Sequence, residues 1–131
     1  MLLRFGSFNF FCFMLLAGCS QQPAASTPPR GVELLLEGKS EDEVKLIQRG
    51  KSVYSTQCIA CHNSNPKEAG ALGPAVAGSS LELLQHRVVT GTFPPGYTPK
   101  PAPSGGQIHM PPMPHLKDEV PAIHAYLNAI K

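Results

Sequence analysis

Cys58-Ile59-Ala60-Cys61-His62 is the stretch that decides how this chain folds. Two thiols separated by two residues, with a histidine directly after the second, are typical of a covalent haem attachment site. Each thiol can add to one vinyl group of the porphyrin, and the adjacent imidazole then lies under the iron as its proximal ligand. We therefore expect Cys58 and Cys61 to hold one haem c, with His62 on the iron.

A CxxC pair also occurs in redox dithiols and in zinc sites. A redox dithiol is expected where a helix follows a strand, and no strand pattern precedes Cys58. A structural zinc site needs two further ligands at short spacing. No cysteine follows Cys61, and His62 adjoins it instead of lying one helical turn away. Haem therefore remains the favoured interpretation.

The composition predicts one small domain with few long regular elements. The chain has 131 residues, of which 15% are charged, 14 are prolines and 12 are glycines. A haem would be the largest apolar object in such a core. The net charge of +2 includes Arg4, which lies in an N-terminal segment that is expected to be removed. So small a charge excludes nucleic acid as a partner.

The N-terminus is predicted to carry an export signal. Arg4 precedes an apolar run that is shorter than the roughly 20 residues of a spanning helix and fits a signal peptide. Small residues then lead into Cys19, which resembles the lipobox of bacterial lipoproteins. The resemblance implies removal of residues 1–18 and a lipid on Cys19. An ordinary secretory signal with a chance cysteine is the alternative.

The lipobox resemblance also implies a location and a division of the chain. It indicates the bacterial cell envelope, with a lipid anchor and a periplasm-facing domain, and Ser20 favours the outer membrane over the inner. Residues 20–31 are rich in proline, serine, glutamine and alanine, as in a polar tether. We expect a lipidated cysteine and tether over residues 19–39 and the haem domain over 40–131.

Two capping boxes predict two helices. Ser40 with Glu43 opens a helix over about 41–55 that leads into the haem motif and has a glycine, Gly50, within its apolar face. Such a glycine indicates close approach by another element. Ser79 with Glu82 opens a second helix through about Val89, stopped by Thr90-Gly91. Its expected buried stripe consists of Leu81, Leu84, Val88 and Val89.

The loop after His62 is expected to supply a partner for the imidazole. A coordinating histidine usually donates its other ring N–H to a carbonyl group. A carbonyl within Leu72-Gly73-Pro74 is the natural acceptor, because the loop must return past the ring, and Pro74 is therefore counted among the cofactor-binding residues. In the alternative interpretation, Pro74 only ends the loop.

Residues 92–109 contain five prolines and three glycines and are expected to wrap the distal side of the haem. Phe93 and Tyr97 can pack on the porphyrin edge or bind a propionate. The segment Met110-Pro111-Pro112-Met113-Pro114 follows, and a thioether from it is the expected second iron ligand. The residues leave Met110 and Met113 open, and His109 and His115 compete with both.

The chain ends in a helix through Ile130, with Asp118 as its expected cap and Pro121 in its first turn. Its apolar stripe at helical spacing consists of Val120, Ile123, Tyr126, Leu127 and Ile130.

Together these features resemble the class I monohaem c-type cytochromes over about residues 41–131. The resemblance implies a small all-α fold, with three to four helices and long loops around one haem. It implies His62 and Met110 as axial ligands, with Met113 as the alternative, and a helix crossing at which Gly50 meets Tyr126. The matching stretches are Cys58-Ile59-Ala60-Cys61-His62, Leu72-Gly73-Pro74, Met110-Pro111-Pro112 and Leu116-Lys117-Asp118-Glu119.

The function expected on these grounds is electron transfer by iron that cycles between Fe(II) and Fe(III), and not enzymatic catalysis. The partners are then redox proteins that donate and accept electrons, and the protein is a monomer or a subunit of a respiratory complex. One alternative is a haem subunit of a larger dehydrogenase or oxidase complex, which an exposed apolar patch around 34–36 would support. Another is a small-ligand-binding or peroxidatic haem protein.

Overall fold

The computed structural model describes residues 36–103, 105 and 110–131, so Cys19, His109 and residues 1–18 lie outside it. Throughout these ranges the chain forms helices and loops and no strand, which confirms the all-α prediction. No helix in the described part of the chain is long and apolar enough to span a membrane. The elements are α2 (Glu41–Gln57), α3 (Leu81–Leu84), η1 (Gln85–Thr90), η2 (Pro114–Glu119) and α4 (Val120–Ala129).

The capping box at the start of α2 is present as predicted. The Ser40 hydroxyl accepts a hydrogen bond from the Glu43 amide at 3.3 Å, and the Glu43 carboxylate accepts one from the Ser40 amide at 3.0 Å. The helix runs two residues further than expected, and the Cys58 amide donates to the Tyr54 carbonyl at 3.0 Å. The haem motif therefore continues directly from a rigid helix.

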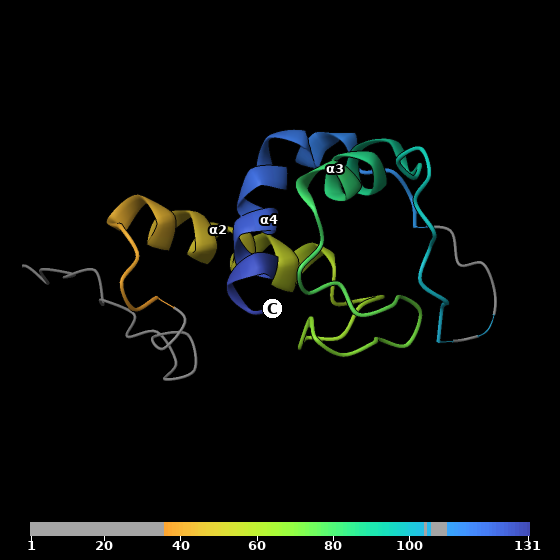
Figure 1. Ribbon diagram of the computed structural model, residues 1–131, viewed down its shortest axis with the longest axis horizontal. Coiled ribbons are helices and arrows are strands. Elements are labelled where there is room, and N and C mark those ends of the chain that lie inside the picture. The colour runs from red at the N-terminus through yellow and green to blue at the C-terminus, as the bar shows by residue number, and fades with distance from the viewer. Residues whose placement is uncertain (1–35, 104, 106–109) are drawn as a thin grey trace, which may run out of the picture.

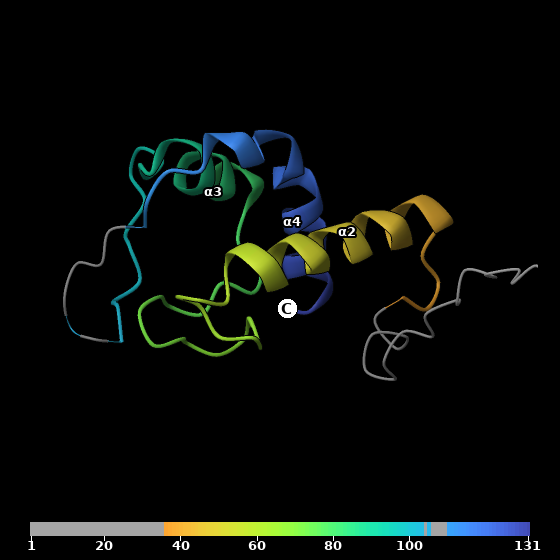
Figure 2. The same cartoon turned by 180° about the vertical axis from the view of Figure 1, so that it is seen from behind.

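Helix α2 crosses α4, and the two views of the chain show this crossing at the centre of the helical part (Figures 1 and 2). At the crossing a side chain on Gly50 would collide with the Ala122 carbonyl oxygen and lie 2.9 Å from the Tyr126 Cβ. The expected meeting of Gly50 and Tyr126 is thus confirmed. The absence of a side chain lets the two backbones touch.

The second helix differs from its prediction in both its cap and its winding. The cap is Ser80, whose hydroxyl accepts from the Leu83 amide at 3.2 Å, whereas the Ser79 hydroxyl donates to the Val76 carbonyl. The predicted Ser79–Glu82 box is therefore wrong, because the preceding turn uses Ser79. After one α-helical turn the chain widens into the π-helix η1. Leu84 and Val88 are buried as expected, Val89 is half-buried, and Leu81 is exposed.

The predicted cap of the last helix is also wrong. Asp118 lies inside the 3₁₀-helix η2, and Glu119 precedes α4 without a side-chain capping bond. The reason is that Pro114 starts a tight turn that leads without a break into α4. Pro121 does lie in the first turn of α4. Four residues of the expected stripe, Val120, Ile123, Tyr126 and Leu127, are buried, and Ile130 is half-buried.

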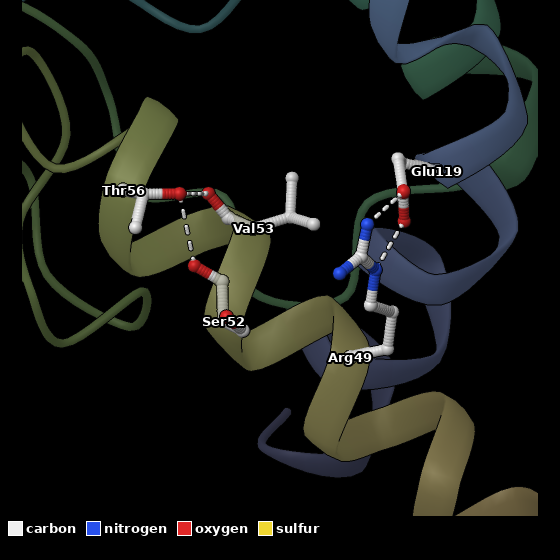
Figure 3. A network of polar contacts seen from close by, with 5 residues as sticks. All are labelled: Arg49, Ser52, Val53, Thr56 and Glu119. Atoms are coloured by element: carbon white, nitrogen blue, oxygen red, sulfur yellow. Dashed lines mark hydrogen bonds and ion pairs between the residues drawn. The ribbon is translucent and has the colours of Figure 1, made fainter.

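An ion pair joins α2 to the last residue of η2, directly before α4 (Figure 3). The Arg49 guanidinium donates to both Glu119 carboxylate oxygens, and the Nε bond measures 2.9 Å. Hydrogen bonding to Arg49 lowers the pKa of Glu119, and the same bonds raise the pKa of Arg49. Arg49 is largely exposed, so solvent screens the attraction and the pair mainly fixes orientation.

Candidate haem-binding site

His62 is held in one orientation by the Gly-Pro loop. Its Nδ1 lies 2.9 Å from the Pro74 carbonyl oxygen, so the expected acceptor within Leu72-Gly73-Pro74 is that of Pro74. A side chain on Gly73 would collide with the ring, lying 2.6 Å from Nδ1 and 3.0 Å from Nε2. The ring therefore packs closely against Gly73, where only a glycine leaves room for it. With Nδ1 acting as the donor, Nε2 keeps its lone pair for a metal.

The two cysteines lie on the turn that leaves α2. The amides of Cys61 and His62 both donate to the Cys58 carbonyl, at 3.2 and 2.9 Å. The Cys61 carbonyl in turn accepts from the amides of Leu72 and Gly73, at 3.2 and 2.9 Å. Both thiols are free and half-buried. The turn thus carries both cysteines and His62 within five residues, and the return loop ties their backbone in place.

The thiol environment does not match the two alternative sites. Burial, and to a lesser extent the neighbouring Cys61, raises the pKa of Cys58 to about 11. A redox dithiol needs the opposite shift, because the thiolate is its reactive form. Among the residues that the structure describes, no three His, Cys, Asp or Glu side chains gather as a metal site would require. The raised pKa of Cys58 therefore does not favour a dithiol catalyst.

Tyr54 is bonded to the backbone directly after His62, a role that sequence reasoning missed. Its hydroxyl donates to the Asn63 carbonyl at 2.6 Å, directly after His62. Its buried ring lies 5.6 Å from that of Tyr126, centroid to centroid. Burial raises the pKa of the Tyr54 hydroxyl, which keeps it protonated as a donor. In the sequence, Tyr54 stands out only as a tyrosine one helical turn before Cys58, and this position does not reveal its bond to Asn63.

The structure brings both candidate sulfur ligands to the core. Met110 and Met113 are half-buried and pack against the central apolar cluster. The Met113 amide donates to the Val88 carbonyl at 2.7 Å. Among the competing histidines, His115 is exposed and His109 lies outside the described residues. The choice between the two methionines remains a prediction.

Phe93 and Tyr97 stack on each other, with ring centroids 5.5 Å apart and planes 9° from parallel. The Arg87 guanidinium lies 4.1 Å from the centre of the Phe93 ring, a cation–π contact. Arg87 also donates to the Gly91 carbonyl. Burial lowers the pKa of Arg87. Sequence reasoning missed Arg87, because a lone arginine on a short helix carries no pattern.

The donor set and its surroundings fit a covalent haem. The chain supplies two thiols, an imidazole with a free Nε2, and two thioethers on a later segment. Ile59, Leu72 and Phe93 are each exposed by 40 to 44%, so the motif and the loops beside it present apolar surface that a porphyrin can cover. The loops after α2 and after η1 lie at the same end of the molecule, away from the start of α2 (Figures 1 and 2).

An open groove of about 460 Å³ lies between η1 and the start of α4, and none of its lining residues is a predicted ligand. This groove is therefore not the haem site. Its walls consist of Gln85, His86, Val89, Thr90, Lys117, Asp118, Val120 and Pro121.

Comparison with known proteins points to the same chemistry. A cytochrome bc1 complex cytochrome c subunit from Corynebacterium diphtheriae is 35% identical over 54 residues, and one from Mycobacterium leprae is 32% identical over 54. Each match covers 41% of this chain and 19% of the relative, so the chain spans about a fifth of these proteins' length. No solved structure matches. The family described as Cytochrome c matches residues 47–131. This chain therefore belongs to the cytochrome c family, and its cofactor is covalently bound haem c.

Proposed function

We propose that the protein is a lipid-anchored monohaem electron carrier with His62 and Met110 as axial ligands. The observation that carries the proposal is the seating of His62. Its Nδ1 is bound to the Pro74 carbonyl, and its ring packs on Gly73, so only Nε2 is free for iron. When bound, haem supplies an iron that takes up and releases one electron.

The protein's own residues control that iron. The Pro74 carbonyl polarises the imidazole and strengthens Nε2 as a donor. Cys58 and Cys61 fix the porphyrin covalently to the end of α2. Met110 would fill the distal position and exclude water and small ligands. With both axial positions filled, the site supports electron transfer and not catalysis, so we propose a carrier and not an enzyme.

The surroundings of the carrier follow from the N-terminal sequence. A lipid on Cys19 would hold the protein at an envelope membrane facing the periplasm, with the outer membrane favoured over the inner. Residues 19–39 would act as a tether for the domain of residues 40–131. The expected partners are redox proteins that bind in small, transient contacts.

The test is an absorption spectrum of the purified protein, oxidised and reduced, beside Met110→Ala and Met113→Ala. We expect a weak near-infrared sulfur-to-iron band that Met110→Ala abolishes and Met113→Ala retains. If only Met113→Ala loses the band, Met113 is the ligand. A high-spin spectrum in the unmutated protein would instead favour the small-ligand-binding or peroxidatic function.

A second candidate is a permanent subunit of a respiratory complex. It is favoured by the two relatives, whose names place them in cytochrome bc1 complexes. Of the apolar patch expected around residues 34–36, residues 34 and 35 lie outside the described residues, and Leu36 is half-buried and packs against the core. Gel filtration of a mild detergent extract separates the two candidates. A free carrier elutes as a small species, and a subunit elutes with its complex.

A further inference from the structure

The π-helix η1 ends in a tight corner at Gly91. Gly91 has φ 73° and ψ 2°, a left-handed conformation that residues with a side chain rarely adopt. The chain therefore turns sharply from η1 into the segment that follows. A π-helical turn is rare and frequently occurs at functional sites. The contacts of this corner therefore indicate what it does in the fold.

The corner meets the methionine segment, residues 110–113, through one hydrogen bond and one close approach. The Val88 carbonyl accepts the Met113 amide at 2.7 Å. The Gly91 Cα faces Pro112, such that a Cβ there would lie 3.5 Å from the Pro112 Cδ and 3.6 Å from the Met110 carbonyl oxygen. One contact is a hydrogen bond and the other is close packing. Together they hold the segment at Pro112 and Met113.

Side chains of η1 itself also stabilise the corner. Arg87 donates to the Gly91 carbonyl and lies over the Phe93 ring, so the residues before and after Gly91 are joined. The Thr90 hydroxyl donates to the His86 carbonyl at 2.8 Å. Gly91 is itself buried. The corner is therefore a rigid support and not a hinge.

The methionine segment is stiff enough that the position of the corner at Gly91 affects where Met110 lies. Pro111 and Pro112 have a fixed φ and carry no amide hydrogen, so the segment is stiff and offers few backbone donors. A stiff segment held at Pro112 and Met113 has little freedom at Met110. A displacement of the corner would therefore move the sulfur.

We propose that Gly91 is a positioning residue for the distal methionine, and that the corner at Gly91 sets the strength of the sulfur–iron bond. This inference rests on the proposed function, because it requires a thioether ligand from the segment 110–113. Gly91 itself touches neither iron nor porphyrin in this role. It acts through its contact with Pro112 and the Met110 backbone.

The test compares Gly91→Val with Gly96→Val in the haem-loaded protein. Gly96 has φ 74°, close to that of Gly91, but a Cβ there would meet nothing within 4 Å. Both variants carry the same backbone strain, and only Gly91→Val presses on the methionine segment. The readouts are the near-infrared band and the affinity of the ferric protein for imidazole, which competes with the sulfur.

We expect Gly91→Val to weaken the band and to bind imidazole about tenfold more tightly, whereas Gly96→Val stays within about twofold of the unmutated protein. Equal imidazole affinities in the two variants would overturn the proposal. If Gly91→Val does not incorporate haem, Gly91→Ala and Gly96→Ala are compared instead. The Cβ of Gly91→Ala would be in van der Waals contact with Pro112 and that of Gly96→Ala would meet nothing, so we expect a smaller difference in the same direction.

If the proposed function is wrong, the spectrum of the unmutated protein already differs from the expected one. An unmutated protein without the near-infrared band would show that no methionine binds the iron, before any variant is made. Hydrogen exchange at the Met113 amide then reports the corner independently of the iron. We expect faster exchange in the Gly91 variant than in the Gly96 variant, and identical exchange would count against the corner.

Discussion

At the scale of single residues, Gly73 determines where the imidazole of His62 lies. A Cβ at this position overlaps the ring, and the neighbouring loop is tied to Cys61 by two hydrogen bonds and cannot easily retreat. We expect Gly73→Ala to weaken the His62–iron bond by about 10- to 100-fold, the usual effect of disturbing the groups around a metal ligand.

The measurement for Gly73→Ala is the fraction of high-spin haem at neutral pH, taken from the absorption spectrum. Gly96→Ala serves as the control, because a Cβ there meets no neighbour within 4 Å. A fully low-spin Gly73→Ala spectrum with an unchanged reduction potential would contradict the prediction.

Tyr54 offers a second prediction at this scale. Tyr54→Phe removes the hydrogen bond to Asn63 and keeps the buried ring, so we expect the free energy of unfolding to fall by about 1 kcal/mol. Tyr126→Phe is the matched control, since its hydroxyl makes no hydrogen bond within the described residues. Denaturant unfolding measures both, and equal losses would show that the Asn63 contact contributes nothing.

Tyr54 also predicts a pH dependence. Burial raises its pKa above the ordinary value of 10.0, so the folded state retains this proton when the unfolded state has lost it. Its contribution to stability is complete below about pH 10 and is lost as the pH rises through the folded pKa. Between pH 10 and 12, Tyr54→Phe should therefore show a shallower fall in unfolding free energy than the unmutated protein.

At the scale of elements, the crossing of α2 and α4 is the contact most sensitive to size. Gly50→Ala gains helix propensity of about 1 kcal/mol, but its Cβ overlaps the Ala122 carbonyl, which is backbone and cannot rotate away. We expect a net destabilisation of about 1–3 kcal/mol in thermal unfolding. Ser52→Ala on the exposed face of α2 is the control, and a Gly50→Ala variant as stable as Ser52→Ala would show that the helices separate freely.

The elements also show how much could be predicted from sequence. The cap at Ser40 and the buried stripe of α4 depend on residues within one helix, so their patterns sufficed. The winding of η1 did not follow from its sequence, because the Val88 carbonyl bonds to Met113, far along the chain. Asp118 was mistaken for a cap because the 3₁₀-turn that contains it starts at Pro114, outside the helix.

The haem site divides in the same way. The two cysteines and His62 could be predicted from the motif, because haem attachment requires this spacing. The Pro74 acceptor followed from the need of an imidazole for a partner. The supports from Tyr54, Arg87 and Gly91 did not follow, because each depends on a loop returning to a helix. The sequence therefore names candidate donors, and the structure adds the residues that position them.

At the scale of the whole molecule, the haem is expected to complete the core. The buried side chains of the described residues come from α2, the α3–η1 segment and the last two helices, and Ile59, Leu72 and Phe93 remain exposed by 40% or more. A Cys58→Ala, Cys61→Ala variant cannot form thioethers. We expect it to lose most of its helical circular dichroism and its cooperative unfolding transition, because a small core rarely suffices alone. A sharp transition near that of the haem-loaded protein would show that the polypeptide folds unaided.

The contact of Gly50 with Ala122 and Tyr126 also has a consequence for biosynthesis. It joins the first helix of the domain to the last, so a chain that emerges N-terminus first cannot make it until α4 has emerged as well. Before that moment α2 has no partner for its apolar face, and an isolated helix of this length is barely stable in water. Until α4 has emerged, this contact does not hold the growing chain, and both thiols stay accessible to the porphyrin.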